Sequence, residues 1–242
     1  MTHGWIIVDK PEGMTSAHVV AKIKRLFKVK KAGHGGTLDP FATGVLPIAL
    51  GEATKALSYI LESTKAYRFE VKWGEARTTD DREGEVTDTS PHHPRTEEIE
   101  EALPLFTGTI TQTPPMYSAL KVNGKRAYAL AREGEKFTLP SRQIDVKSLT
   151  LISTSPQTAT FEVVCSKGTY VRSLARDIAL HLGTYGHVIT LRRLQAGPFH
   201  EKSAILLDSF LEIGHNTELA SYVLPIQDAL ADILALEIKD SE

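Results

Sequence analysis

Strict alternation of apolar and polar side chains predicts a strand at 67–73, where Tyr, Phe, Val and Trp alternate with Arg, Glu and Lys. This is the pattern of a strand with one buried face. Further strands are predicted from shorter apolar runs at 5–8, 144–146, 149–153, 158–165 and 187–194. The chain is therefore expected to build its core from strands spread over most of its length.

Two segments show the 3.6-residue spacing of an amphipathic helix instead. The first is capped by Thr15 or Ser16, both good N-terminal caps, and places apolar residues at 19, 20, 23, 26 and 27. The second, at 171–182, carries its apolar residues on one face and ends at Gly183, a typical helix stop. Weaker signals predict helices at 51–61 and 96–103. No internal repeat, low-complexity tract or domain-sized linker separates these elements.

A glycine-rich stretch at 33–47 follows the first helix and leads into an apolar run at 45–50. Its glycines permit unusual backbone angles and let another molecule approach closely. Asp39 stands before Pro40, which favours an extended backbone at Asp39. The sequence therefore predicts one carboxylate on a stiff segment beside an accessible loop. The alternative is an ordinary surface turn, because Gly, Asp and Pro are the commonest turn residues.

Charge is uneven along the 242 residues, although the net charge is only −2. Residues 1–60 hold eight Lys or Arg and four acids, so the part with the glycine-rich stretch is basic. Lys22, Lys24 and Arg25 lie on the polar face of the first predicted helix. Such a face is usually only solvated. Here it leads into the glycine-rich stretch, which favours contact with the phosphates of a polyanion.

A single cysteine, Cys165, excludes an internal disulfide and a cysteine-cluster zinc site. The N-terminus lacks a signal pattern and no apolar run reaches membrane-spanning length, so we expect a cytoplasmic protein without membrane contact. His92 and His93 do not predict a metal site, because adjacent histidines in an extended chain point in opposite directions. Nothing nearby completes a ligand set.

Several other polar or aromatic residues are candidates for a site, each with a plain structural alternative. Asp81 lies in a charged connection at 76–90, where most acids are merely solvated. Arg172, at a strand-to-helix junction, is either a surface charge or a fixed partner for a carboxylate or phosphate. Tyr67 is either a core aromatic or a flat platform for a base. Residues 115–143 lack a broad apolar face and are expected to form a peripheral excursion.

Taken together, these stretches resemble the TruB family of tRNA pseudouridine synthases, which isomerise the T-loop uridine at tRNA position 55. The resemblance covers residues 4–235. It rests on seven segments in the family's order, at 9–16, 33–43, 50–55, 67–68, 116–121, 165–172 and 188–194. One such segment would be a weak signal, whereas seven in order are a strong one.

The resemblance implies an α+β pseudouridine synthase fold, with a mixed, largely antiparallel central sheet flanked by helices. Residues 115–143 would form the family's RNA-gripping thumb. We expect a single catalytic domain over 1–242, since the chain ends where the family usually continues into a small C-terminal RNA-binding PUA domain. The expected partner is the T-arm stem-loop of a tRNA. A monomer is expected, with no protein partner, cofactor or metal.

On the matching positions, the resemblance makes Asp39 the catalytic nucleophile and Arg172 its partner. Tyr67 would stack on the flipped uracil and handle proton transfer. The residues expected to bind substrate are Lys10, His34, Lys55, Asp81, Tyr170 and Leu191. In one departure, Arg77-Thr78-Thr79 stands where the family usually has Thr-Asp-Thr.

Within the substrate-binding set, His34 would hold the rearranged T-loop once the target base has left. Asp81 would support Arg172, while Tyr170 and Leu191 would line the base pocket. These assignments come from the resemblance alone.

The reaction itself breaks a C–N glycosidic bond, rotates the uracil and forms a C–C bond to C5. One ionised carboxylate suffices for it, attacking either the ribose C1′ or the uracil C6. Other function classes fit less well. A glycoside hydrolase using Asp39 and Asp81 would not need the basic helix face, and a P-loop NTPase would need a Gly-Lys-Ser/Thr ending. A non-catalytic tRNA-binding or tRNA-folding module remains as the alternative.

Overall fold

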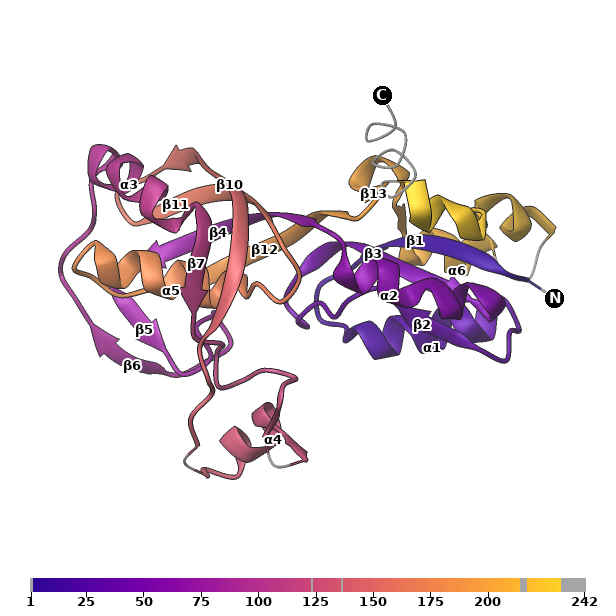
Figure 1. Cartoon of the computed structure of the whole chain (residues 1–242), viewed down its shortest axis with the longest axis horizontal. Helices are drawn as coiled ribbons and strands as arrows, with labels where there is room; N and C mark the ends of the chain where they lie inside the picture. The colour runs from indigo at the N-terminus through magenta and orange to yellow at the C-terminus, as the bar shows by residue number, and fades with distance from the viewer. Residues whose placement is uncertain (1, 123, 136, 214–216, 232–242) are drawn as a thin grey trace. The chain divides into compact units, whose positions relative to one another are not determined.

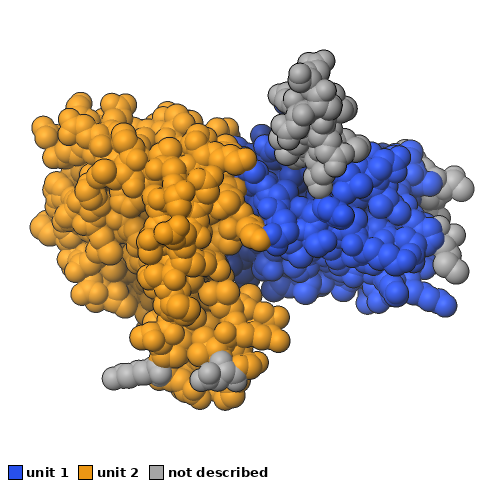
Figure 2. Space-filling model, viewed as in Figure 1, with its two compact units in different colours: residues 1–67, 191–242 blue, residues 68–190 orange. Residues whose placement is uncertain are grey.

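The computed structural model describes residues 2–122, 124–135, 137–213 and 217–231. The described part of the chain divides into two compact units (Figure 2). The first unit holds residues 1–67 and 191–242, and the second holds residues 68–190. Two strands, β4 (Lys65–Trp73) and β12 (Gly186–Ala196), have residues in both units.

The first unit contains the chain's early strands and its C-terminal helical turns (Figure 1). Its own strands are β1 (Gly4–Lys10), β2 (Ala32–His34), β3 (Thr43–Leu50), β13 (Phe199–His200) and β14 (Ile205–Leu206). Its helices are α1 (Ser16–Leu26), α2 (Leu57–Glu62) and α6 (Leu207–Ile213). Its 3₁₀ turns are η1 (Gly51–Ala56), η3 (Glu201–Ser203), η4 (Thr217–Tyr222) and η5 (Ile226–Leu230).

Strand β3 is the hub of the first unit. It pairs antiparallel with β1 from Gly4↔Leu50 to Lys10↔Gly44, antiparallel with β2, and parallel with β12. The core beside it contains the rings of Trp5 and Phe199, whose centroids lie 5.5 Å apart. Burial of such large rings removes much apolar surface from water and so stabilises this unit.

The second unit contains a long antiparallel sheet and its covering helix. Its own strands are β5 (Glu75–Arg77), β6 (Val86–Thr89), β7 (Gly108–Gln112), β8 (Lys121–Val122), β9 (Lys125–Arg126), β10 (Arg142–Thr154) and β11 (Thr158–Cys165). Its helices are α3 (Thr96–Ala102), α4 (Ala127–Arg132) and α5 (Val171–His181), with the 3₁₀ turn η2 (Leu103–Phe106).

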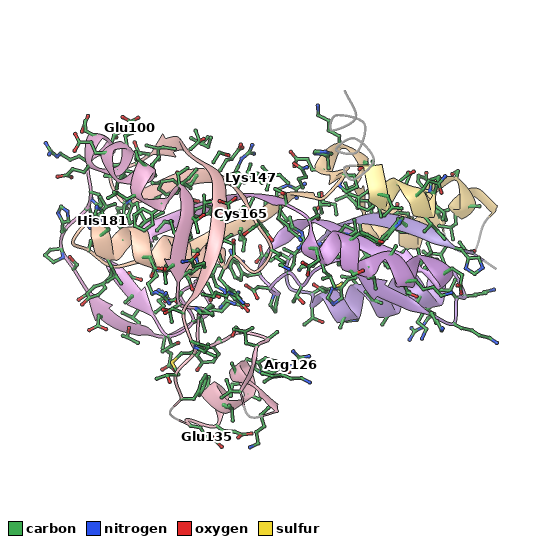
Figure 3. All side chains as sticks on the ribbon, in the orientation of Figure 1. Glu100, Arg126, Glu135, Lys147, Cys165 and His181 are labelled. Carbon is green, nitrogen blue, oxygen red and sulfur yellow. The ribbon has the colours of Figure 1, made fainter. Side chains whose placement is uncertain are left out.

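Within the second unit, β10 pairs antiparallel with both β11 and β7. The rings of Phe69 and Trp73 pack on Phe161 at centroid distances of 5.3 and 6.4 Å. Helix α4 stands apart from the sheet of this unit, in a small lobe that also carries Arg126 and Glu135 (Figures 1 and 3). This lobe lies within the excursion expected at 115–143.

Among the described residues the main strands form one sheet of ten, in the order β14-β1-β3-β12-β4-β11-β10-β7, with β13 on β12 and β2 on β3. Most of its pairings are antiparallel, while β1–β14 and β12–β3 are parallel. The expected α+β architecture, a mixed and largely antiparallel sheet flanked by helices, is confirmed. No helix in the described ranges is long and apolar enough to cross a membrane.

Three local predictions differ from the structure. The two strands expected at 144–146 and 149–153 are one strand, β10, whose register shifts at two irregularities instead of breaking. The polar connection at 76–90 contains the hairpin β5–β6. The single helix expected at 51–61 begins as the 3₁₀ turn η1 and becomes α-helical only at Leu57.

Candidate active site

The segment that carries Asp39 is hydrogen-bonded to the first residue of α1. Ser16, which is buried, accepts a hydrogen bond from the Leu38 N–H (2.9 Å) and lies 3.2 Å from the Leu38 oxygen, to which its hydroxyl donates. On the other side of Asp39, the Gly13 N–H donates to the Pro40 oxygen (2.9 Å). The backbone around the half-buried Asp39 is thus held on both sides, as a reacting carboxylate requires.

Lys10 adds a buried cation to this support. Its side chain is 0% exposed. Its ammonium donates to the carbonyl oxygens of Pro11 (2.8 Å), Met14 (2.6 Å) and Pro40 (3.1 Å). The structure therefore gives Lys10 a function in shaping the Asp39 segment, and its expected contact with substrate stays a prediction.

We expect Lys10→Met to lower both stability and turnover. The substitution keeps the length of the side chain but leaves buried carbonyls without a charged donor, which costs about 3 kcal/mol. Urea unfolding measures the first effect and kcat the second. Lys202→Met, on the exposed 3₁₀ turn η3 of the same unit, is the matched control and should leave both unchanged. A fully stable Lys10→Met protein would contradict this assignment.

Arg193, on the neighbouring strand β12, is hydrogen-bonded to the backbone of the glycine-rich stretch. It is 1% exposed, and it donates to the oxygens of Val45 (2.7 Å) and Gly36 (3.1 Å). Gly44, at φ +100°, lies so close that an added Cβ would stand 2.2 Å from the Arg193 oxygen. Arg193 was not among the site residues predicted from the sequence. Its one available signal was a pair of arginines inside an otherwise apolar strand.

His34, the last residue of β2, is half-buried. Burial lowers the pKa of its imidazole, and the nearby charge of Arg193 lowers it further. A hydrogen bond with the backbone of Gly36 acts in the opposite direction. The imidazole is therefore neutral near pH 7, suited to stacking and hydrogen bonding with RNA and not to pairing with phosphate.

This lowered pKa predicts a loss of stability in mild acid. Below an ordinary histidine pKa of about 6.5, the unfolded chain takes up a proton that folded His34 does not, so the free energy of unfolding falls with pH until the folded pKa is also passed. Urea unfolding between pH 7 and pH 5 measures the loss. It should be smaller in His34→Gln, and unchanged in the control His18→Gln at an exposed position. Equal losses in all three proteins would refute the expectation.

Arg172 and Asp81 form a buried ion pair in the second unit. Arg172, in the first turn of α5, is 5% exposed and Asp81 is 3% exposed. Arg172 Nη1 lies 3.3 Å from Asp81 Oδ2, and the guanidinium also donates to the oxygens of Thr79 (2.9 Å) and Tyr117 (3.0 Å). Asp81 Oδ1 accepts from the Thr79 hydroxyl (2.5 Å). Arg172 is therefore rigidly oriented.

The other expected site residues occupy varied settings. Tyr67, on β4, is half-buried, and Leu191, on β12, is buried. Tyr170 precedes α5 and is half-buried. Lys55 is exposed and pairs with Glu52 one turn earlier. Within the described residues no group of three or more His, Cys, Asp or Glu side chains is placed to hold a metal ion.

The structure gathers these residues in two sets, one in each unit. Asp39 belongs to the first unit with Lys10, His34, Lys55, Tyr67 and Leu191, while Arg172 belongs to the second with Asp81 and Tyr170. The expected pairing of Asp81 with Arg172 is present. The expected pairing of Arg172 with Asp39 stays a prediction.

Comparison with known proteins decides the family. The profile described as TruB family pseudouridylate synthase (N terminal domain) matches residues 24–171, and that of the tRNA pseudouridylate synthase B C-terminal domain matches 172–231. The chain belongs to the TruB family. It is 53% identical to tRNA pseudouridine synthase B of Rhodospirillum rubrum, over 99% of this chain and 78% of the relative. It is 52% identical to the same enzyme of Bartonella bacilliformis, over 98% of this chain and 74% of the relative.

Solved structures give this TruB-family chain close neighbours as well. A chain from a Cbf5-Nop10-Gar1 complex superposes with a TM-score of 0.73 at 31% identity, and a chain of an H/ACA RNP bound to a substrate RNA containing 2′-deoxyuridine with 0.70 at 28%. Each alignment covers 94% of this chain, but only 61% and 60% of the respective neighbour. Together with the family profiles, this likeness supports the expected pseudouridine synthase fold.

Proposed function

We propose that this protein is a tRNA pseudouridine synthase that converts the uridine at position 55 of the T-loop into pseudouridine. The observation that carries the proposal is the 53% identity, over 99% of the chain, to a relative named tRNA pseudouridine synthase B. The rigid support of Asp39 adds to it, because the reaction needs one well-placed carboxylate. A non-catalytic tRNA-binding module is disfavoured, since relatives this similar carry the name of an enzyme.

In the proposed mechanism Asp39, as a carboxylate, attacks the target nucleoside and forms a covalent intermediate. The C1′–N1 bond breaks, the uracil rotates, and a new bond joins C1′ to C5. The proton on C5 leaves to solvent with the help of Tyr67, N1 takes up a proton from solvent, and Asp39 is released unchanged. Nothing is oxidised, and the proton gained at N1 balances the one lost from C5, so the product is an isomer of the substrate. Arg172 supplies a positive charge that keeps the carboxylate ionised.

Access to the base requires that the uridine leave the stacked loop, because its reacting atoms are covered within the stack. We assign the flipped base to Tyr67, Tyr170 and Leu191, and the rearranged loop to His34. Phosphates would contact the exposed basic residues of α1 and of the segment after it, which include Lys24, Arg25, Lys28, Lys30 and Lys31. In the second unit, Arg126, exposed on the lobe with α4, is a separate candidate for contact with phosphate (Figure 3).

The further expectations are proposals of the same kind. We propose a single catalytic domain over 1–242 with a thumb at 115–143, acting in the cytoplasm as a monomer and without a protein partner. Sedimentation of the purified chain, with and without T-arm RNA, measures the number of copies in the complex. One chain per RNA is the expected result.

Release of tritium from T-arm RNA labelled at uridine C5 tests the proposed function. Isomerisation replaces the C5–H bond by a C5–C1′ bond, so turnover must release the label. We expect release with the labelled uridine at position 55 and none when the label is confined to other loop positions. Tight binding without release would mean a binding module and would overturn the proposal.

A further inference from the structure

Two residues that face each other on neighbouring strands close the base of the lobe that carries α4. Strand β7 ends at Gln112 and β10 begins at Arg142, and these two are the end pair of the β7–β10 ladder. The chain between them, 113–141, contains β8, β9 and α4. The chain therefore both leaves for the lobe and returns from it at this pair.

Gln112 forms two hydrogen bonds with the backbone of Tyr170, the residue expected to line the base pocket. The Gln112 side chain is 1% exposed. The Tyr170 N–H donates to Gln112 Oε1 (2.8 Å), and Gln112 Nε2 donates to the Tyr170 oxygen (3.1 Å). That oxygen also accepts the Leu174 N–H (3.0 Å), a hydrogen bond of the first turn of α5. A buried amide satisfied at both ends fixes Tyr170 and the start of the helix together.

Arg142, on the facing strand β10, contacts both the ring of Tyr170 and the turn that precedes this residue. Its guanidinium carbon lies over the Tyr170 ring, 5.0 Å from the centroid, at a distance typical of a cation–π contact. The guanidinium also donates to the Gly168 oxygen. Gly168, at φ +79°, takes a backbone conformation that other residues rarely adopt, and so allows the turn that brings its oxygen to Arg142.

Helix α5 also binds the first residues of the lobe. The Thr113 oxygen accepts hydrogen bonds from the Ser173 hydroxyl and from Arg176 Nη2, both at 2.9 Å. Arg172 reaches the Tyr117 oxygen a few residues later. Hydrogen bonds therefore connect the first residues of the lobe directly to the start of α5. Tyr170, just before this helix, is contacted by both Gln112 and Arg142.

We propose that Gln112 and Arg142 are positioning residues for Tyr170: Gln112 sets its backbone and Arg142 its ring, so that the base of the thumb determines where the base-pocket tyrosine stands. This inference deepens the proposed function and rests on it, because Tyr170 matters to catalysis only if it contacts the flipped uracil. Neither residue needs to touch RNA. Substitution of either residue should therefore slow the reaction of the bound complex without weakening the binding of RNA.

The test compares Gln112→Ala and Arg142→Lys, made in the whole 242-residue chain, with Gln143→Ala, an exposed glutamine of the same strand pair. Tritium release from T-arm RNA gives kcat and KM, and thermal unfolding gives Tm. We expect kcat to fall about tenfold with KM nearly unchanged in both test variants, the signature of an interaction used after binding. Gln143→Ala should match wild type. Arg142→Lys keeps a positive charge at a partly exposed site, so it remains informative if Gln112→Ala unfolds.

A spectroscopic readout separates positioning from general damage. In protein labelled with 3-fluorotyrosine, the ¹⁹F resonance of Tyr170 is assigned by its loss in Tyr170→Phe. It should shift in Gln112→Ala and Arg142→Lys, and stay in place in Gln143→Ala. An unmoved resonance, or an unchanged kcat, overturns the inference while wild type remains active. Absence of tritium release from wild type would instead overturn the proposed function.

Discussion

Replacing Asp39 with asparagine is expected to abolish pseudouridine formation while leaving the fold and the affinity for T-arm RNA nearly unchanged. The amide has the shape of the carboxylate but is not nucleophilic, so the covalent step has no substitute. Loss of a nucleophile typically costs at least about 10⁴-fold in kcat. The segment itself is held through its backbone by Ser16 and Lys10, and those contacts do not involve the substituted atoms.

Tritium release measures the loss, and filter binding with T-arm RNA measures the retained affinity. The matched control is Asp88→Asn, an exposed acid on β6, which should behave as wild type. Mass spectrometry must exclude deamidated protein, which would restore the aspartate. Turnover within about a hundredfold of wild type in deamidation-free Asp39→Asn would contradict the assignment of Asp39 as the nucleophile.

Removal of the Arg172 side chain should have the second-largest effect, on stability as well as on turnover. Arg172→Met leaves the carboxylate of Asp81 buried without its cation, at a typical cost of about 3–5 kcal/mol. Arg68→Met removes the guanidinium of an exposed pair with Glu162 and should cost no more than about 1 kcal/mol. Urea unfolding of the two variants, both in the second unit, measures the contrast.

A double variant separates the two functions of this arginine. Arg172→Met combined with Asp81→Leu replaces the buried pair by apolar groups, which commonly restores stability. It should recover part of the stability lost in Arg172→Met, although the oxygens of Thr79 and Tyr117 still lack their donor. It should nevertheless remain inactive, because the positive charge proposed to keep Asp39 ionised is gone. Full activity in the stable double variant would show that Arg172 serves the fold alone.

The parts of the fold that were predictable have a local cause. Strand β4 and helix α5 follow from side-chain periodicities that are complete within each segment. Strand β10 was expected as two strands because the register irregularity between Val146 and Ser148 shifts which face is apolar, and an alternation rule interprets such a shift as an end. The β5–β6 hairpin gave no signal, because β6 is exposed along its whole length and has no buried face to mark it.

Residues of the candidate site were predictable where the residue type and its sequence neighbours indicate the chemistry. They were less predictable where their function depends on contacts with distant parts of the chain. Asp39 is marked by its proline and glycine neighbours, and Arg172 by its place at the start of a helix. Gln112 and Arg193 were missed because their partners are backbone groups 58 and 148 residues away. Glutamine and arginine look the same in a sequence whether they face solvent or a distant carbonyl.

The buried positions of Lys10 and Arg193 also divide the protein's positive charge into two kinds. Exposed lysines and arginines attract RNA through a field that ions in solution screen, so the affinity of the complex falls as ionic strength rises. Lys10 and Arg193 bind carbonyl groups inside the fold, where mobile ions do not enter and screening is weak. Added salt should therefore change how often a tRNA is captured, and have little influence on what happens to its uridine afterwards.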